Sequence, residues 1–190
     1  MLDAVIEPAA PQVVLTVPHS LCEQPCRAGR TCDCVAGQRA LQLELLLREA
    51  GVSVVRLSAD NYRRNVDLNR WPARNTEYRK SIRRYLQSAE RPRLLLDIHS
   101  YPAETDRSVW AQHSLVLLWE GALLYPQSIL ELSRRSGALL VRGERNDIID
   151  EAHENAVPAV LLEFNEDFYR SGDLFSIVNW VVSLLNKNSN

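Results

Sequence analysis

Several features that would place this chain in other classes of protein are absent from its sequence. No apolar run reaches the roughly 18–20 residues that a membrane-spanning helix needs. The first residues, MLDAVIEPAAPQ, lack the basic and apolar regions of a signal peptide. A formal net charge of −2 provides no electrostatic footprint for nucleic acid or for an anionic membrane. We therefore expect a cytoplasmic protein that binds neither of these partners.

Cysteine is absent from Val35 to the last residue, because all four cysteines lie between Cys22 and Cys34. A secreted disulfide scaffold would spread its cysteines along a shorter chain, so this cluster is local. Reduced thiols, one short-range disulfide and metal ligands all remain open. A non-catalytic metal-binding or redox module built on these cysteines is the alternative from another functional class, although the spacing C-x3-C-x5-C-x-C matches no common zinc finger.

The sequence also lacks repeats and linkers, and its apolar runs alternate with amphipathic stretches, which favours one α/β domain over residues 1–190. Short runs rich in β-branched and aliphatic residues predict strands, and apolar residues at helical spacing predict helices. The predicted strands are 11–17, 52–57, 93–98, 114–119, 138–141 and 159–164, and the predicted helices are 35–50, 77–90, 127–136, 147–155 and 173–185, the last with Asp173 as N-cap. This order predicts a three-layer sandwich with a mixed, largely parallel sheet.

Three of the predicted strands carry polar residues near their carboxyl ends. His19 follows the first strand, His99 follows the third, and Glu163 lies in the last. In an open α/β sheet, ligands bind outside the carboxyl ends of the strands, so these residues can meet in one cleft. A buried carboxylate such as Glu163 needs a cation, a metal or a proton nearby. Asp97 raises the same problem, and a structural hydrogen bond and a role in orienting a metal ligand explain it equally well.

These residue types suit amide hydrolysis by a metal-activated water. Zinc binds imidazole nitrogen and carboxylate oxygen and keeps one position for water. A second carboxylate can move the proton of that water, and an arginine such as Arg70 can bind a substrate carboxylate through two hydrogen bonds. A nucleophilic serine enzyme is disfavoured because no G-x-S-x-G is present, and no glycine-rich phosphate loop is present either.

Four motifs occur in the order found in N-formylglutamate amidohydrolases, a family with the zinc carboxypeptidase-like fold. They are TVPHS at 16–20, VDLNR at 66–70, LLDIHS at 95–100 and AVLLEFNE at 159–166. The chain resembles this family from about residue 13 to residue 169. The resemblance implies one zinc ion bound by His19 and His99, Glu163 as the general base, and Asn69 and Arg70 as the residues that bind a substrate carboxylate.

The third metal ligand is less clearly marked in the sequence. Carboxypeptidases place a glutamate three residues after the first histidine, where this chain has Cys22, followed by Glu23. The deformylases instead carry an aspartate before the first helix, a place that Asp33 suits. We favour Asp33 over Cys22 and Glu23, because a short carboxylate at a loop-to-helix junction can face the site and cap the helix. A simple helix cap is the alternative interpretation of Asp33.

The sequence therefore predicts a zinc-dependent amidohydrolase acting on an N-acyl or N-formyl amino acid that carries a carboxylate. The loop after His19 departs from the family, since Leu21 replaces a glycine and cysteines follow it. A zinc carboxypeptidase or a cell-wall amidase on the same fold is the alternative within enzymes. Arg142, Arg145 and Asn146 are further residues that could contact an acidic substrate, and a solvated loop explains them equally well.

Overall fold

The structure, a computed structural model, describes residues 10–22, 32–102, 109–119, 126–142 and 146–187. Its six strands are β1 (Val13–Val17), β2 (Val54–Ser58), β3 (Leu94–Tyr101), β4 (Leu115–Trp119), β5 (Leu139–Arg142) and β6 (Ala159–Asn165). Its α-helices are α1 (Ala36–Glu49), α2 (Glu77–Leu86), α3 (Pro126–Ser136), α4 (Asp147–Glu154) and α5 (Ser171–Lys187), and two short 3-10 helices are η1 (Trp71–Asn75) and η2 (Trp110–Gln112). All the elements predicted from the sequence are present, with ends that shift by a few residues.

The six strands form one mixed sheet in the order β2-β1-β3-β6-β4-β5. Strands β1, β2, β3 and β6 pair in parallel, whereas β4 pairs antiparallel with β6 and parallel with β5. The eight residues of β3 are all buried, as expected for a central strand covered on both faces. The predicted mixed, largely parallel sheet is confirmed.

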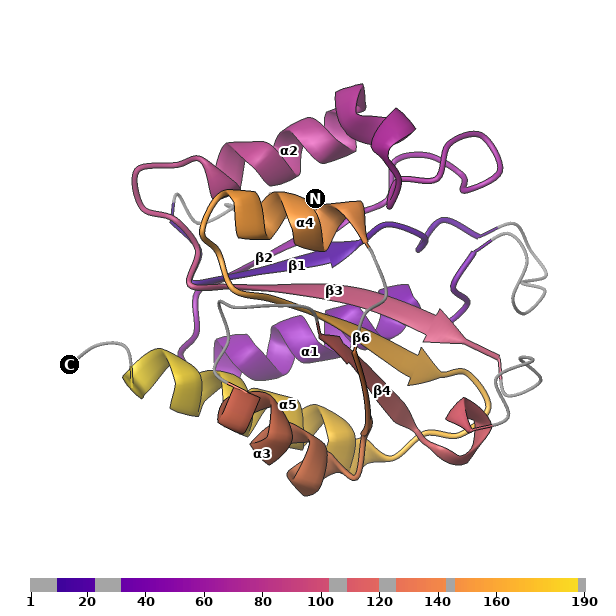
Figure 1. The fold of residues 1–190 in the computed structure, drawn as a ribbon, viewed down its shortest axis with the longest axis vertical. Helices are drawn as coiled ribbons and strands as arrows, with labels where there is room; N and C mark the ends of the chain where they lie inside the picture. The colour runs from indigo at the N-terminus through magenta and orange to yellow at the C-terminus, as the bar shows by residue number, and fades with distance from the viewer. Residues whose placement is uncertain (1–9, 23–31, 103–108, 120–125, 143–145, 188–190) are drawn as a thin grey trace, which may run out of the picture.

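Helices cover both faces of the sheet and create two hydrophobic cores (Figure 1). Helices α1, α3 and α5 pack on one face, against residues such as Leu96 and Leu162. Helices α2 and α4 pack on the other face, against residues such as Leu95 and Leu161. The three layers therefore match the predicted sandwich. Among the described residues, no helix has both the length and the apolar character that crossing a membrane would require.

The start of α5 differs from the prediction that Asp173 caps this helix. The helix begins at Ser171, and Asp173 lies buried within its first turn. Acidic residues are favourable both at the N-cap and in the first turn, because the helix dipole is positive there. The sequence signal could not separate these two positions, and the prediction of the N-cap was wrong.

The sheet places several polar side chains on the face covered by α2 and α4. Successive residues of a strand alternate between faces, so Asp97 and His99 share the face of Leu95. Glu163 lies beside His99 in register on β6, and Thr16 lies beside Asp97 on β1. These residues lie toward the carboxyl ends of three neighbouring parallel strands. The fold therefore collects them at one edge of one face.

Candidate metal centre

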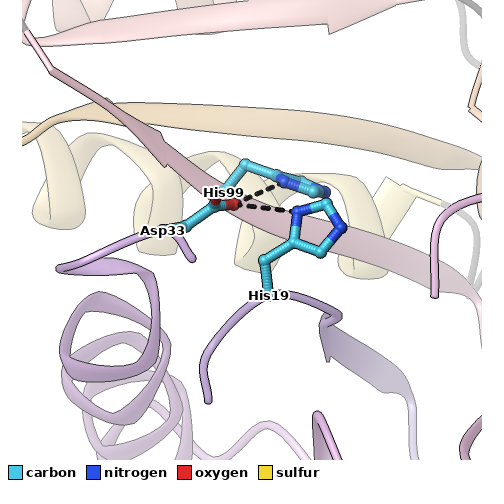
Figure 2. A group of neighbouring side chains, drawn as sticks. All are labelled: His19, Asp33 and His99. Carbon is cyan, nitrogen blue, oxygen red and sulfur yellow. Dashed lines mark hydrogen bonds and ion pairs between the residues drawn. The ribbon is translucent and has the colours of Figure 1, made fainter. Parts of the chain in front are cut away.

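His19, Asp33 and His99 meet at this edge of the sheet (Figure 2). His19 follows β1, His99 lies in β3, and Asp33 lies in the loop before α1. Asp33 Oδ2 lies 2.7 Å from His99 Nδ1 and 3.4 Å from His19 Nδ1. The two imidazole rings have centroids 5.0 Å apart and pack edge to face. Residues 80 positions apart in sequence thus direct one ring nitrogen each toward a single carboxylate oxygen.

The three side chains are almost fully removed from solvent, with residue exposures of 3% for His19, 5% for Asp33 and 4% for His99. Burial alone would lower the pKa of His99, but the Asp97 and Asp33 carboxylates outweigh it and raise that pKa well above its usual value. Burial alone would raise the pKa of Asp33, but His99 and His19 hold it well below its usual range. The opposite directions of the two pKa shifts show that the His99 ring and the Asp33 carboxylate favour each other's charged form.

The outer nitrogen of each imidazole also meets a carboxylate. His19 Nε2 lies 2.8 Å from Asp67 Oδ1, and His99 Nε2 lies 3.1 Å from Asp97 Oδ2. Burial raises the pKa of Asp67, but its hydrogen bond to His19 and the charge of that ring bring the pKa down to about 2. Histidines that bind metals usually hydrogen-bond a carboxylate through the other ring nitrogen, which fixes the orientation of the ring. Both candidate ligands have this arrangement.

Asp97 is fully buried and, besides its contact with His99, is held by two neighbours. Thr16 Oγ1 donates a hydrogen bond to Asp97 Oδ1 at 2.6 Å, and Asn146 Nδ2 donates one to Asp97 Oδ2 at 2.6 Å. Asn146 also caps α4, because its Oδ1 accepts hydrogen bonds from two backbone amides of the first turn. The structure thus assigns Asp97 to orienting His99. Asn146 belongs to the support of the site, whereas Arg145 lies outside the described residues.

The donor set fits a divalent metal such as zinc. One ligand atom from each of His19, Asp33 and His99 lies within 4.8 Å of the others. His19 Nδ1 is buried and faces Asp33 Oδ2 at 3.4 Å without a hydrogen bond to any described residue, which suits a nitrogen that binds a cation. Two imidazoles and one carboxylate are a common zinc ligand set in hydrolases and leave a fourth position for water. The predicted trio can therefore hold one ion.

Asn69 lies beside His99 and Arg70 lies beside Asp67, and these two side chains differ in exposure. Asn69 is buried, and its Nδ2 lies 2.9 Å from His99 Nε2, while its Oδ1 has no hydrogen-bond partner among the described residues. The Arg70 side chain is 56% exposed and lies 4.0 Å from Asp67 Oδ2. Arg63 lies 3.7 Å from carboxylate oxygens of both Asp33 and Asp67. Two cationic side chains therefore lie near the carboxylates of Asp33 and Asp67.

Glu163 is half-buried and occupies the position in β6 that is paired with His99. Residues paired in this way on neighbouring strands project to the same face of the sheet. Glu163 therefore shares the face that carries His99, on the neighbouring strand. It also approaches Tyr101, whose pKa rises to about 12, mainly through burial and further through the Glu163 charge.

The structure gives the described cysteines a role other than that of metal ligands. Cys22 forms a disulfide with Cys32, and Cys34 is also disulfide-bonded. Cys22 therefore offers no thiolate, and the interpretation of Cys22 as third ligand was wrong. Glu23 and Cys26 lie outside the described residues. Of Cys22 and Asp33, the two alternatives among the described residues, the structure brings Asp33 to the two histidines, and Asp33 does not cap α1, whose N-cap is Val35.

Sequence reasoning missed Asp67. The VDLNR motif was interpreted through its Asn-Arg pair alone, although an acidic residue two positions earlier was visible in the same motif. The turn explains the geometry, because Asp67 Oδ1 accepts a hydrogen bond from the Asn69 amide at 3.1 Å while it also contacts His19. An aspartate that folds back on its own backbone two residues later is a common turn signal and could have been recognised.

No protein-family model matches this sequence, and no curated protein matches it significantly. Among solved structures, the chain is similar to gene product Atu2144 from Agrobacterium tumefaciens, with 14% identity, coverage of 93% of this chain and 88% of that chain, and a TM-score of 0.65. It also matches N-formylglutamate amidohydrolase from Ralstonia eutropha JMP134, with 12% identity, coverage of 96% and 94%, and a TM-score of 0.44. The similarity to Atu2144 establishes a shared fold and does not by itself indicate an activity.

Proposed function

We propose that this chain is a metal-dependent amidohydrolase that cleaves the amide bond of a small N-acyl or N-formyl amino acid bearing a carboxylate. The observation that carries the proposal is the convergence of His19, Asp33 and His99 on one edge of the sheet. Two of these residues are held by further carboxylates, as is usual for histidines that bind zinc. The order of the four sequence motifs supports the same activity.

The chemistry assigns one task to each residue. A bound zinc ion would polarise the scissile carbonyl and acidify the attacking water. The Glu163 carboxylate, on the same face as His99, would accept the proton of that water and pass it to the leaving amine nitrogen. Asn69 and Arg70 would hold the substrate carboxylate, the first as a buried amide beside His99 and the second as an exposed cation beside Asp67.

The positive charge of two arginines near the candidate ligands favours a small anionic substrate. Arg63 and Arg70 both lie at the rim of the site, near Asp33 and Asp67. A substrate carboxylate entering there would compete with Asp67 for these guanidinium groups. N-formylglutamate is the leading candidate substrate. Peptides with a blocked or a free carboxyl terminus would test the carboxypeptidase alternative. Muropeptides would test the cell-wall amidase alternative.

The proposal is tested by metal content and turnover in three variants. His99→Ala should lose bound zinc, whereas His113→Ala should keep it, because the His113 ring lies outside the group of candidate ligands, with its Nδ1 3.3 Å from the Gly137 carbonyl. Glu163→Gln should retain zinc and lose hydrolysis by at least about 10²- to 10⁴-fold, the usual contribution of a general base. Retention of stoichiometric zinc by His99→Ala, or full turnover by Glu163→Gln, would contradict the proposal.

A further inference from the structure

Asp33 is the candidate ligand that lies in a loop, away from the strands of the sheet. His99 lies within β3, and His19 follows β1 after a single residue, Pro18. Asp33 lies in the loop before α1, and its backbone amide donates a hydrogen bond to the His19 carbonyl at 3.0 Å. A loop carboxylate has more conformational freedom than a strand residue and must lose it to bind a cation. The contacts that fix Asp33 therefore bear directly on metal affinity.

The segment after Asp33 is anchored by the disulfide of Cys34 and by hydrogen bonds. The Cys34 amide donates to Glu166 Oε1 at 2.8 Å, and the Val35 amide donates to Ser100 Oγ at 3.3 Å. Ser100 Oγ in turn donates to Glu166 Oε1 at 2.8 Å. These bonds tie the start of α1 to the ends of β3 and β6. They do not restrain the part of the loop that precedes Asp33, which needs another contact.

That restraint is the disulfide between Cys22 and Cys32. Cys32 is the residue directly before Asp33 and is 2% exposed, and Cys22 lies three residues after His19. The bond closes a loop with a sequence separation of 10. It also creates a short covalent route from His19 to Asp33, through residues 20–22 and then Cys32. His19 and Asp33 thus flank the two ends of the disulfide, and a short covalent path links them.

We propose that the Cys22–Cys32 disulfide is a positioning element of the metal centre, which holds the Asp33 carboxylate against the two imidazoles. This inference rests on the proposed function, since it concerns the same metal ion. Without the disulfide, Asp33 samples more positions in the metal-free protein, and binding the ion must then restrict it. The disulfide therefore acts on metal affinity and not only on the stability of the fold.

The length of the loop bounds the expected effect. The disulfide shortens the connection from His19 to Asp33 from about 13 to about 5 residues. By the entropy of loop closure, this difference corresponds to roughly a fourfold change in the affinity for zinc. Full release of a loop of about 11 residues corresponds to roughly a 100-fold change. The hydrogen bond from the Asp33 amide to the His19 carbonyl remains and restricts the loop, so the change should fall between these limits.

The test measures zinc affinity of the full chain by competition with a chromophoric chelator. The protein is compared with the double variant Cys22→Ser/Cys32→Ser, in which no thiolate is created that could itself bind zinc. If this variant does not fold, Cys22→Ala/Cys32→Ala replaces it, because Cys32 is buried and apolar surroundings tolerate alanine. Leu132→Ala in α3 serves as the control for stability, since its buried side chain packs on the opposite face of the sheet.

We expect the dissociation constant for zinc to rise between about fourfold and about 100-fold in the cysteine variant and to stay within twofold in Leu132→Ala. An unchanged dissociation constant in a folded cysteine variant would overturn the inference and leave the proposed function standing. Equal weakening in Leu132→Ala would also overturn it, since general loss of stability would then explain the effect. Failure of the unmodified chain to bind zinc would overturn the proposed function and this inference together.

Discussion

Arg79 offers the most demanding test of how the site is supported. This arginine lies in α2, and its side chain is 2% exposed. Its guanidinium donates to Glu151 Oε2 of α4 through Nε at 3.0 Å and Nη2 at 2.6 Å. It also donates to the carbonyls of Leu68 at 3.1 Å and Asp147 at 2.9 Å. Leu68 lies between Asp67 and Asn69, so one buried cation joins two helices to the segment that contacts both histidines.

Arg79→Met retains much of the side-chain volume and removes all four hydrogen bonds. Breaking one side of a buried ion pair costs about 3–5 kcal/mol, because the remaining charge stays buried. Arg83 still donates to Glu151 Oε1 at 2.9 Å, so we expect a loss near the lower limit. A loss of about 3 kcal/mol corresponds to a fall in Tm of about 6–12 °C for a chain of this size.

The measurement is urea denaturation at pH 7, followed by the fluorescence of the buried Trp110 and Trp180. Arg83→Met is the matched control, because Arg83 bonds the same glutamate but is 20% exposed, and its loss should cost only about 1 kcal/mol. The double variant Arg79→Met/Glu151→Leu should recover part of the loss, since no charge remains buried alone. Equal stabilities of Arg79→Met and Arg83→Met would refute the reasoning.

Three further predictions concern single positions. Asp67→Asn should weaken zinc binding by about 10- to 100-fold by loosening His19, as measured by chelator competition, and an unchanged affinity would show that Asp67 does not orient this ring. Burial raises the pKa of Asp173, although Ser114 and Arg170 act in the opposite direction. Protonation of Asp173 therefore favours the folded state, and this contribution to stability is lost as the pH rises through the pKa of the folded protein. Asp173→Asn should therefore raise the free energy of unfolding at pH 7 and lose that advantage below about pH 3.5, whereas a pH-independent effect in urea titrations would contradict the assignment. Gly51→Ala should cost about 1–2 kcal/mol in the same titrations, because Gly51 has φ of +80° with open space around its Cα, and a neutral result would count against backbone strain.

The sequence and the structure agree best where local patterns are strong. The β-branched run that forms β1 and the aliphatic run that forms β3 are covered on both faces, so hydrophobic burial alone specifies them. The start of α5 was misplaced because an acidic residue suits both the cap and the first turn. Helix ends depend on one or two hydrogen bonds, which compete with tertiary contacts that the sequence does not display.

The candidate site also has features that the sequence could reveal and features that it could not. Histidine and glutamate at strand ends could be recognised because parallel strands bring their carboxyl ends together. Asp33 was chosen among three alternatives, and only the path of the loop decided that its carboxylate meets His99 Nδ1 while Cys22 is held in a disulfide. Asp67 was missed because its contact with His19 spans 48 positions and depends on the turn before η1.

The sequence by itself determined the alternation of strands and helices, the sandwich that follows from it, and the polar residues that end its central strands. It could do so because burial and periodicity act over a few neighbouring residues. The tertiary structure alone decided which carboxylate faces the two imidazoles, which carboxylates hold their outer nitrogens, and which cysteines pair. Those contacts join loops that are far apart along the chain, and their geometry is set by packing across the whole sheet.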